Sequence, residues 1–332
     1  MQGLAPVRLP PFASRLSVLI ACGGLLLLAC VLGLSVGGVK LDWSALSHPG
    51  PAGDVARVIA QLRAPRVALA ALVGACLALA GAALQALLKN PLADPFLLGT
   101  SGGAATGAAL ASLFGVSPFL SPGAAFAGAA ASAVGVAALA RRGGRLDLNR
   151  LLLAGLIANA FFSAMLLLIF SAASSETARS MLFWMMGSLA DATPARIAVL
   201  APYAAAGAAV LLAFASRLNL FAVGEENAAA LGVDTEAAKR VVFLAAALLT
   251  GAAVAFAGVI GFVGLLVPHG VRAVAGNEQR TLLPASALSG AALLVVADAA
   301  SRAVLAPGEL PIGAVTAAVG APVFVWLLLR QP

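Results

Sequence analysis

Long uncharged apolar runs recur along the chain, and their length is the strongest constraint on its fold. The run from Val67 to Leu88 contains no acidic or basic residue, and about 20 apolar residues are enough for a helix to cross a bilayer. Of the 332 residues, 62% are hydrophobic and only 10% are charged, a balance outside the range of soluble globular domains. The chain is therefore expected to be an integral membrane protein.

The apolar runs predict a single transmembrane domain over residues 1–332, an all-α polytopic membrane protein with ten transmembrane helices. The runs are continuous and rich in Gly and Ala, whereas a transmembrane barrel would show short alternating segments. The expected helices lie at 16–38, 66–88, 98–114, 123–140, 151–170, 196–215, 241–257, 262–273, 283–298 and 312–329. The helix at 262–273 is too short to cross a bilayer alone.

The distribution of positive charge predicts the orientation. With the N-terminus inside, most of the 20 Lys and Arg residues fall in connections on the cytoplasmic side, where positive charge is retained. Both termini are therefore expected in the cytoplasm, and the first apolar run is expected to be a retained helix. The net charge of +7 is attributed to this topology and to contact with lipid headgroups. No nucleic acid partner is expected, because stacking aromatics and a soluble basic face are absent.

Cys22, Cys30 and Cys76 lie inside apolar runs and share no metal-ligand spacing. Such cysteines are most simply small core residues. We expect no disulfide, no metal site and no cofactor in this chain.

The segment NPLADPFLLG, from Asn90 to Gly99, places two prolines, an amide and an acid between two apolar runs. Irregular backbone cannot face lipid, because each unpaired N–H or C=O group costs several kcal/mol there. The turn must therefore lie at a membrane face or line a water-filled path. The segment alone does not distinguish a gate from an ordinary loop.

An internal similarity relates the two halves of the chain. The segments Gly74–Pro91 and Gly251–Pro268 match at both glycines, at several alanines and at the final proline. They belong to the second and seventh expected helices, which would cross the membrane in opposite directions. This predicts an inverted repeat of helices 2–5 and 7–10, a plan common among transporters.

The chain shows no energy source of its own. The dipeptide Gly-Lys never occurs, which excludes a phosphate loop of the GxxxxGK[ST] type. Ion-driven carriers usually keep acids, bases or His inside the bilayer, and here Asp298 near a helix end and His269 after Pro268 are the main candidates. The chain is therefore not expected to be an enzyme, and another polypeptide is expected to supply the energy.

A polar segment from Leu218 to Arg240 is the candidate docking surface for that polypeptide. Glu225 and Glu226 favour a helix start, Gly232 favours its end, and Asp234 can cap a second short helix that closes with Lys239 and Arg240. The segment predicts an elbow of two short helices, and a solvated connector is the alternative.

Seven sequence blocks, taken together, resemble the FecCD-like permease subunits of type II ATP-binding-cassette (ABC) importers, which take up cobalamin, haem and iron-siderophores. The blocks are QLRAPR (61–66), GACLALAGAALQALLKNPLADPFLLGTSGGA (74–104), RLLLAGL (150–156), FWMMGSL (183–189), GEENAAALGV (224–233), AGVIGFVGLLVPHGVR (257–272) and ELPIGAVTAAVGAPVFVWLLL (309–329).

The resemblance implies a homodimer in a bacterial inner membrane, with two cytoplasmic ATPase subunits and a periplasmic binding protein. Residues matching Arg63, Arg66 and Arg302 dock the binding protein in this family. All three fall on the outside in the predicted topology, where exposed charges can steer a soluble partner.

The resemblance also assigns a cytoplasmic gate and a coupling segment. The gate residues are Asn90 and Leu92 in the first turn and Leu148 and Asn149 in a second turn. The second turn lacks the small hydroxyl residues of the cobalamin-transporting members. The ATPase-coupling residues are Gly224, Glu225, Glu226, Ala230, Leu231, Gly232, Lys239 and Arg240.

Two functional classes follow. One is the membrane subunit of an ATP-driven importer of a bulky metal chelate, with haem as the preferred cargo, then an iron-siderophore, then cobalamin. The other is a self-contained carrier driven by an ion gradient. The scarcity of intramembrane carboxylates and the presence of the elbow favour the importer.

Overall fold

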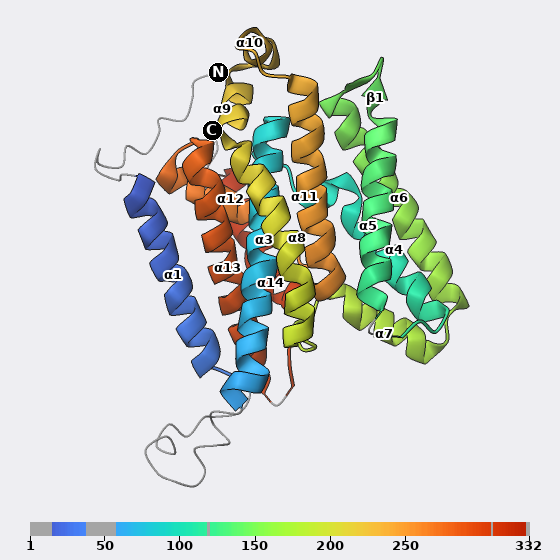
Figure 1. Ribbon diagram of the computed structural model, residues 1–332. Coiled ribbons are helices and arrows are strands. Elements are labelled where there is room, and N and C mark those ends of the chain that lie inside the picture. Colours follow the sequence, from blue (N-terminus) through green and yellow to red (C-terminus); the bar gives the residue numbers. More distant parts are fainter. Residues whose placement is uncertain (1–14, 38–57, 118–119, 307, 330–332) are drawn as a thin grey trace.

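The computed structural model describes residues 15–37, 58–117, 120–306 and 308–329, which form a helical bundle (Figure 1). The α-helices are α1 (Arg15–Ser35), α3 (Ala64–Leu88), α4 (Thr100–Leu113), α5 (Ser121–Leu139), α6 (Leu148–Ala172), α7 (Ser175–Met185), α8 (Pro194–Ala213), α9 (Ala215–Val223), α10 (Glu225–Ala230), α11 (Thr235–Ala257), α12 (Val263–Ala275), α13 (Gln279–Val304) and α14 (Ile312–Leu329). A π-helical turn η2 (Val58–Arg63) precedes α3, and a 3-10 turn η3 (Pro95–Leu98) precedes α4. An antiparallel hairpin joins α5 to α6 through β1 (Arg141–Arg142) and β2 (Arg145–Leu146).

The prediction of an all-α polytopic fold is confirmed. Each of the ten expected ranges contains a helix, and seven helices in the described residues are long and apolar enough to cross a membrane. Helix α12 is short, as the sequence predicts. Helix α7 and the separation of α9 from α8 at Phe214 were not predicted.

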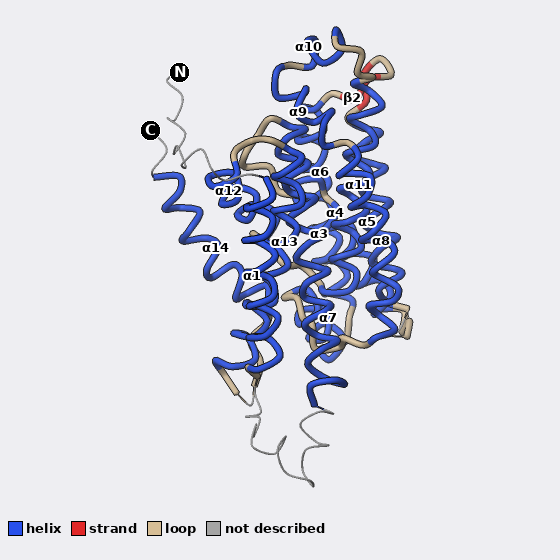
Figure 2. Tube along the Cα trace, turned by 60° about the vertical axis from the view of Figure 1, so that its left-hand side comes forward, coloured by secondary structure: helices blue, strands red, loops and turns tan. Residues whose placement is uncertain are grey.

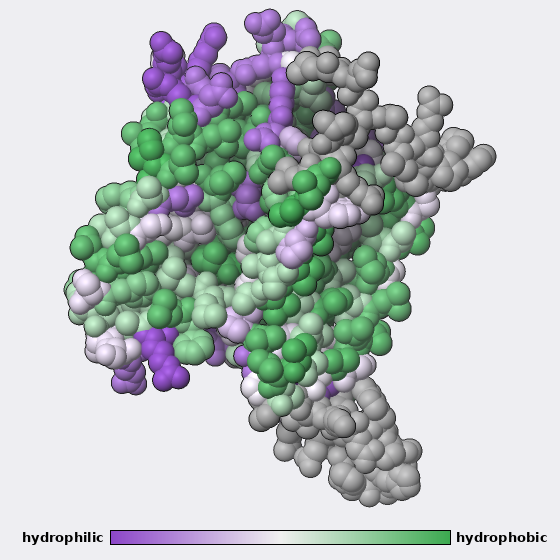
Figure 3. All heavy atoms as spheres, turned by 180° about the vertical axis from the view of Figure 1, so that it is seen from behind, coloured by the Kyte–Doolittle hydropathy of each residue, from purple (hydrophilic) through white to green (hydrophobic). Residues whose placement is uncertain are grey.

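Three helices form the centre of the bundle. Helices α3, α11 and α13 are mostly buried, whereas fewer than a third of the residues in the apolar windows of α1, α5, α6 and α8 are buried. Figure 3 shows hydrophobic side chains over much of the side of the bundle. The central helices approach closely through small residues, since a Cβ atom added at Gly81 would overlap the carbonyl group of Gly264 in α12. Close backbone approach of this kind stabilises helix packing in lipid, where the hydrophobic effect between helices is lost.

The two ends of the bundle carry different features (Figures 1 and 2). Helix α1 begins at the end that carries α10 and the hairpin, while α7 lies at the opposite end. Helices α3 and α11 run in opposite directions, as the inverted repeat predicts, but the aligned prolines are not equivalent. Pro91 lies in the turn after α3, whereas Pro268 lies inside α12. Four charges used to predict the orientation, Arg8, Lys40, Arg57 and Arg330, lie outside the described residues.

Candidate functional site

The three arginines predicted for docking lie at the α7 end of the bundle, where two of them, Arg66 and Arg302, share one buried acid. Asp298 in α13 is fully buried and accepts from Arg66 Nε over 2.7 Å and from Arg302 Nε over 2.9 Å. Both terminal nitrogens of Arg66 also contact the Glu309 carboxylate, at 2.9 and 3.0 Å. Paired, hydrogen-bonded charges of this kind are tolerated inside a protein.

The remaining arginine nitrogens satisfy the end of α1. Arg63 Nη1 donates to the carbonyl oxygens of Leu34 and Ser35, each over 2.8 Å, and Arg302 donates to Val36 and Gly33. Basic side chains near a helix C-terminus satisfy its unpaired carbonyl groups.

The expectation that the docking arginines are exposed is therefore wrong. Arg63 and Arg302 are each only 5% exposed, because the end of α1 and the acid of α13 enclose them. Their docking role stays a prediction.

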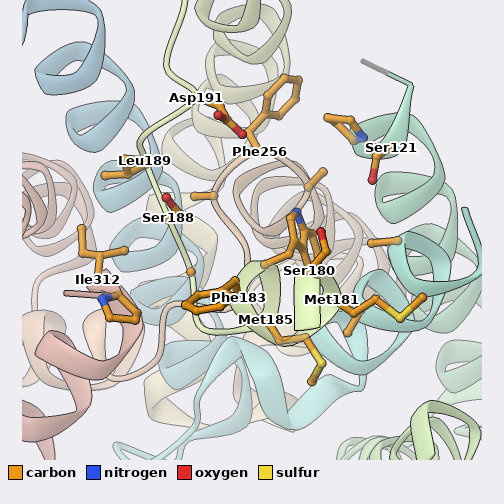
Figure 4. A pocket seen from close by; sticks show the side chains of 18 of the residues that line it. Ser121, Ser180, Met181, Phe183, Met185, Ser188, Leu189, Asp191, Phe256 and Ile312 are labelled. Atoms are coloured by element: carbon orange, nitrogen blue, oxygen red, sulfur yellow. The ribbon is translucent and has the colours of Figure 1, made fainter. Parts of the chain in front are cut away.

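A cavity of about 400 Å³ adjoins this cluster, between α4, α5, α7 and the segment before α14 (Figure 4). Its lining includes Met181, Phe183 and Met185 of α7 together with Arg66 and Glu309. The volume lies within the range of about 300–1,000 Å³ that is usual for small-molecule sites. Met181, Phe183 and Met185 were not predicted as site residues, because α7 was not predicted, although the N-cap signal of Ser174 was present.

The turn after α3 folds back into the bundle, so protein groups satisfy its backbone as predicted for irregular chain in a membrane protein. Asn90 Oδ1 accepts from Leu92 N over 2.9 Å, and Asn159 of α6 donates to Phe96 O over 3.0 Å. Leu92 is 37% exposed and can contact another surface.

Gln85 anchors the same turn through Ala93 and was not predicted as a site residue. Its Nε2 lies 3.3 Å from the carbonyl oxygens of Ala93, Gly264 and Leu265, and its Oε1 accepts from Arg272 over 3.0 Å. In the sequence, Gln85 is a polar amide inside an apolar run. A buried amide of this kind must find hydrogen-bond partners.

The second predicted gate turn follows the hairpin. Asp147 caps α6 and accepts from the backbone N–H groups of Asn149 and Arg150. These hydrogen bonds, that of Arg150 foremost, lower the pKa of Asp147 because they stabilise its ionised form. Leu148 is half-buried and Asn149 is exposed.

A second cavity, of about 480 Å³, lies between the end of α3, the second gate turn and the elbow. Its lining comes from the end of α3 (Leu88, Lys89), from the second turn and from Glu225, Glu236 and Lys239. The structure therefore brings the flank of the first turn, the second turn and the predicted coupling segment together around one polar cavity.

The elbow differs from the prediction in one part. Helix α10 begins at Glu225, and Gly232 follows it with a φ of 83°, a conformation that favours glycine. Asp234 caps the next helix through Ala237 N, as predicted. That helix does not close at Arg240 but continues as α11 to Ala257, because no helix-breaking residue follows and acids neutralise Lys239.

The coupling residues themselves divide into exposed and buried groups. Glu226, Ala230, Leu231, Gly232 and Arg240 are exposed, Gly224 and Glu225 are partly exposed, and Lys239 is buried. The exposed group can contact a partner directly, whereas Lys239 cannot.

A multi-pass helical bundle whose irregular backbone is hydrogen-bonded within the protein has the architecture of a membrane transport protein. Comparison with known families identifies it further: residues 25–330 match the FecCD transport family, and the chain belongs to that family. It is therefore a transmembrane permease, which confirms the resemblance seen in the sequence.

Individual relatives cover most of the chain. It is 43% identical to the cobalamin import system permease protein BtuC of Halobacterium salinarum, over 82% of this chain and 73% of that protein. It is 38% identical to the hemin transport system permease protein HmuU of Yersinia pestis, over 96% of this chain and 97% of that protein. The solved structure of an inward-facing metal-chelate type ABC transporter matches with a TM-score of 0.87 and 31% identity, over 95% of this chain and 99% of that chain.

Proposed function

We propose that this chain is the permease subunit of a type II ABC importer, which moves a bulky metal chelate from a periplasmic binding protein to the cytoplasm. The observation that carries the proposal is the likeness of nearly the whole chain to a metal-chelate type ABC transporter. The transporter contains two copies of this chain and two ATPase subunits, in a bacterial inner membrane with both termini of the chain in the cytoplasm.

Each partner has a candidate surface. The exposed residues of α10 and the start of α11 contact the ATPase, and the arginine cluster at the opposite end supports docking of the binding protein. The outward face of α6 is apolar, with Leu153, Leu156 and Ile157 each more than 60% exposed, and it suits either lipid or the second copy.

Haem is the preferred cargo and an iron-siderophore is the next. The second gate turn, Asp147-Leu148-Asn149-Arg150, lacks the small hydroxyl residues of cobalamin-transporting members. Cobalamin is the alternative, and the 43% identity to a cobalamin permease favours it.

The carrier hypothesis loses its main candidate residue. Asp298 was the intramembrane acid closest to what an ion-driven carrier needs, and two arginines occupy both of its carboxylate oxygens. A carboxylate neutralised in this way is a poor site for a transported proton or sodium ion.

The test is uptake by the complex of this chain with its ATPase in proteoliposomes, supplied with binding protein and haemin, an iron-siderophore or cobalamin. We expect concentrative uptake that requires ATP and is insensitive to ionophores. Uptake by this chain alone that an ionophore abolishes would contradict the proposal.

The elbow is tested by Ala230→Trp, which places bulk on an exposed residue of α10. We expect loss of ATPase co-purification or at least a tenfold fall in transport per ATP hydrolysed. Leu16→Trp, on the exposed face of α1, is the control for bulk and should change neither. Gly232 is unsuitable because its positive φ would strain any other residue. Normal assembly and transport in Ala230→Trp would make the elbow a solvated connector.

A further inference from the structure

Lys239 is a buried cation at the elbow end of α11. It is 3% exposed, and its ammonium group contacts three oxygen atoms: it forms ion pairs with Glu225 and Glu236 and donates a hydrogen bond to one backbone carbonyl group. Glu225 Oε1 of α10 lies at 2.7 Å, Glu236 Oε1 at 2.5 Å and the carbonyl oxygen of Leu146 in β2 at 3.0 Å. One side chain therefore joins α10, α11 and the hairpin.

The contact with the hairpin is two-sided. Leu146 gives its carbonyl group to Lys239 and its N–H group to Glu236 Oε2, over 2.8 Å. Leu146 is 3% exposed, so its peptide groups lie among protein atoms. A buried peptide group that is left without a hydrogen bond destabilises the fold. The side chains of Lys239 and Glu236 therefore hold this strand residue in place.

Leu146 directly precedes the second gate turn. Asp147, the next residue, caps α6 through Asn149 and Arg150, and its own N–H group donates to Ala140 O over 3.1 Å. A displacement of Leu146 would therefore move the cap and the first turn of α6 with it.

We propose that Lys239 is a positioning residue that transmits movement of the elbow to the gate turn at Leu148 and Asn149, with Glu225 and Glu236 as its partners. This inference rests on the proposed function of the elbow as the ATPase contact. Lys239 is buried and does not touch the ATPase, whereas its neighbour Arg240 is exposed. The two adjacent cations thus have separate roles.

The role of Lys239 can be tested by replacing its charge with an apolar side chain of similar size. In Lys239→Met the apolar side chain fills a similar volume. Glu225, whose side chain is 42% exposed, can then be solvated by water, and Glu236 keeps the hydrogen bond that its Oε2 accepts from Leu146 N. Arg217→Met is the control for loss of a cation, because Arg217 is exposed on α9 and its guanidinium group lies over the ring of Phe214, three residues earlier in the chain.

The first measurement is the ratio of cargo transported to ATP hydrolysed, in the assembled complex in proteoliposomes. For Lys239→Met we expect normal assembly, ATP hydrolysis within about twofold of the parent and a ratio at least tenfold lower. For Arg217→Met we expect normal assembly and the parent ratio. The double variant Glu236→Gln, Lys239→Met should lower the transport ratio no further than the more severe single variant does, since both substitutions act through the same contact.

The second measurement needs no cargo. Spin labels at Ala229 in α10 and Arg142 in β1, both exposed, report the distance between elbow and hairpin in a background with Cys22, Cys30 and Cys76 replaced by Ala. In the parent complex the distance should be the same without nucleotide and with ADP-vanadate, because the two segments move together. In Lys239→Met the two distributions should separate.

The outcomes distinguish the two levels of inference. If the parent chain does not assemble with the ATPase, the proposed function fails and this inference fails with it. If the parent transports normally while Lys239→Met keeps both its transport ratio and its label distances, only the role of Lys239 is overturned. If Lys239→Met fails to fold, the complex will not assemble. The single variant Glu236→Gln then tests the role of Lys239 by the same two measurements, and a parent-like transport ratio with parent-like label distances would overturn it.

Discussion

At the scale of single residues, the molecule depends on a few buried charges that are fully paired. Asp298 holds Arg66 and Arg302 together, and those arginines in turn bind the last carbonyl groups of α1. Removing one partner from such a group leaves an uncompensated buried charge, which is far more costly than the loss of an exposed pair.

We expect Asp298→Ala to destabilise the protein by about 3–5 kcal/mol, because it leaves two buried arginines without their shared acid. The control is Glu309→Ala, which removes an acid of the same cluster whose side chain is 44% exposed. Exposed pairs contribute about 0–1 kcal/mol, so this variant should unfold close to the parent. Unfolding midpoints in detergent micelles, followed by Trp fluorescence, check the difference. Equal shifts in the two variants would show that the cluster is not a structural centre.

At the scale of elements, glycine sets how closely the helices pack. Gly81 of α3 lies against Gly264 of α12, and Gly103 of α4 lies against Gly128 of α5. A methyl group at either contact would meet backbone atoms, which cannot move aside as the end of a side chain can. The separation between these helices is therefore fixed by the absence of a Cβ atom.

Gly81→Ala should lower the free energy of unfolding by about 1–3 kcal/mol, the usual penalty for overpacking a well-packed interior. Gly135 of α5 provides the matched control, since it is exposed and a Cβ atom there meets nothing within 4 Å. Gly135→Ala should be neutral or stabilising by about 0.4–1 kcal/mol, because Ala restricts the unfolded chain. Thermal unfolding of both variants in the same detergent measures the contrast. A harmless Gly81→Ala would mean that α12 can shift away from α3.

At the scale of the whole molecule, the two gate turns, the hairpin and the elbow converge at one end of the bundle (Figure 1). The arginine cluster and the cavity beside α7 lie at the other end. Helices α3 and α11 span the distance between them and are mostly buried. This arrangement separates the proposed energy input from the proposed entry of cargo while keeping both on the same rigid helices.

Closure at the elbow end is expected to depend on side-chain size in the first turn. Asn90→Ala combined with Leu92→Ala removes the cap of that turn and its exposed apolar side chain, so the closed gate should widen. Proteoliposomes carrying this variant should leak small solutes without ATP, while the complex with the ATPase still assembles. Leu120→Ala, a comparable truncation of an exposed leucine beyond these turns, should not leak. Leak equal to that of the parent in an intact complex would make the turn a structural corner only.

Much of the fold could be predicted because its signals are local. A run such as Val67–Leu88 must form a helix, since lipid cannot hydrogen-bond an open backbone, and caps such as Asp147 and Asp234 act within three residues of themselves. Helix α7 was missed because it is short and contains Glu176 and Arg179, so it lacks the long apolar run on which the prediction depended.

The sequence alone therefore determined that this chain is a polytopic helical membrane protein, where its ten apolar helices lie and which family it resembles, since these depend on hydropathy and on contiguous motifs. Only the tertiary structure decided which charges are buried and with which partners. Arg66 and Asp298 are 232 residues apart, and Lys239 lies 93 residues beyond Leu146. No local pattern encodes such pairs, because helices rich in Ala and Gly offer many similar faces and only packing selects the ones that meet.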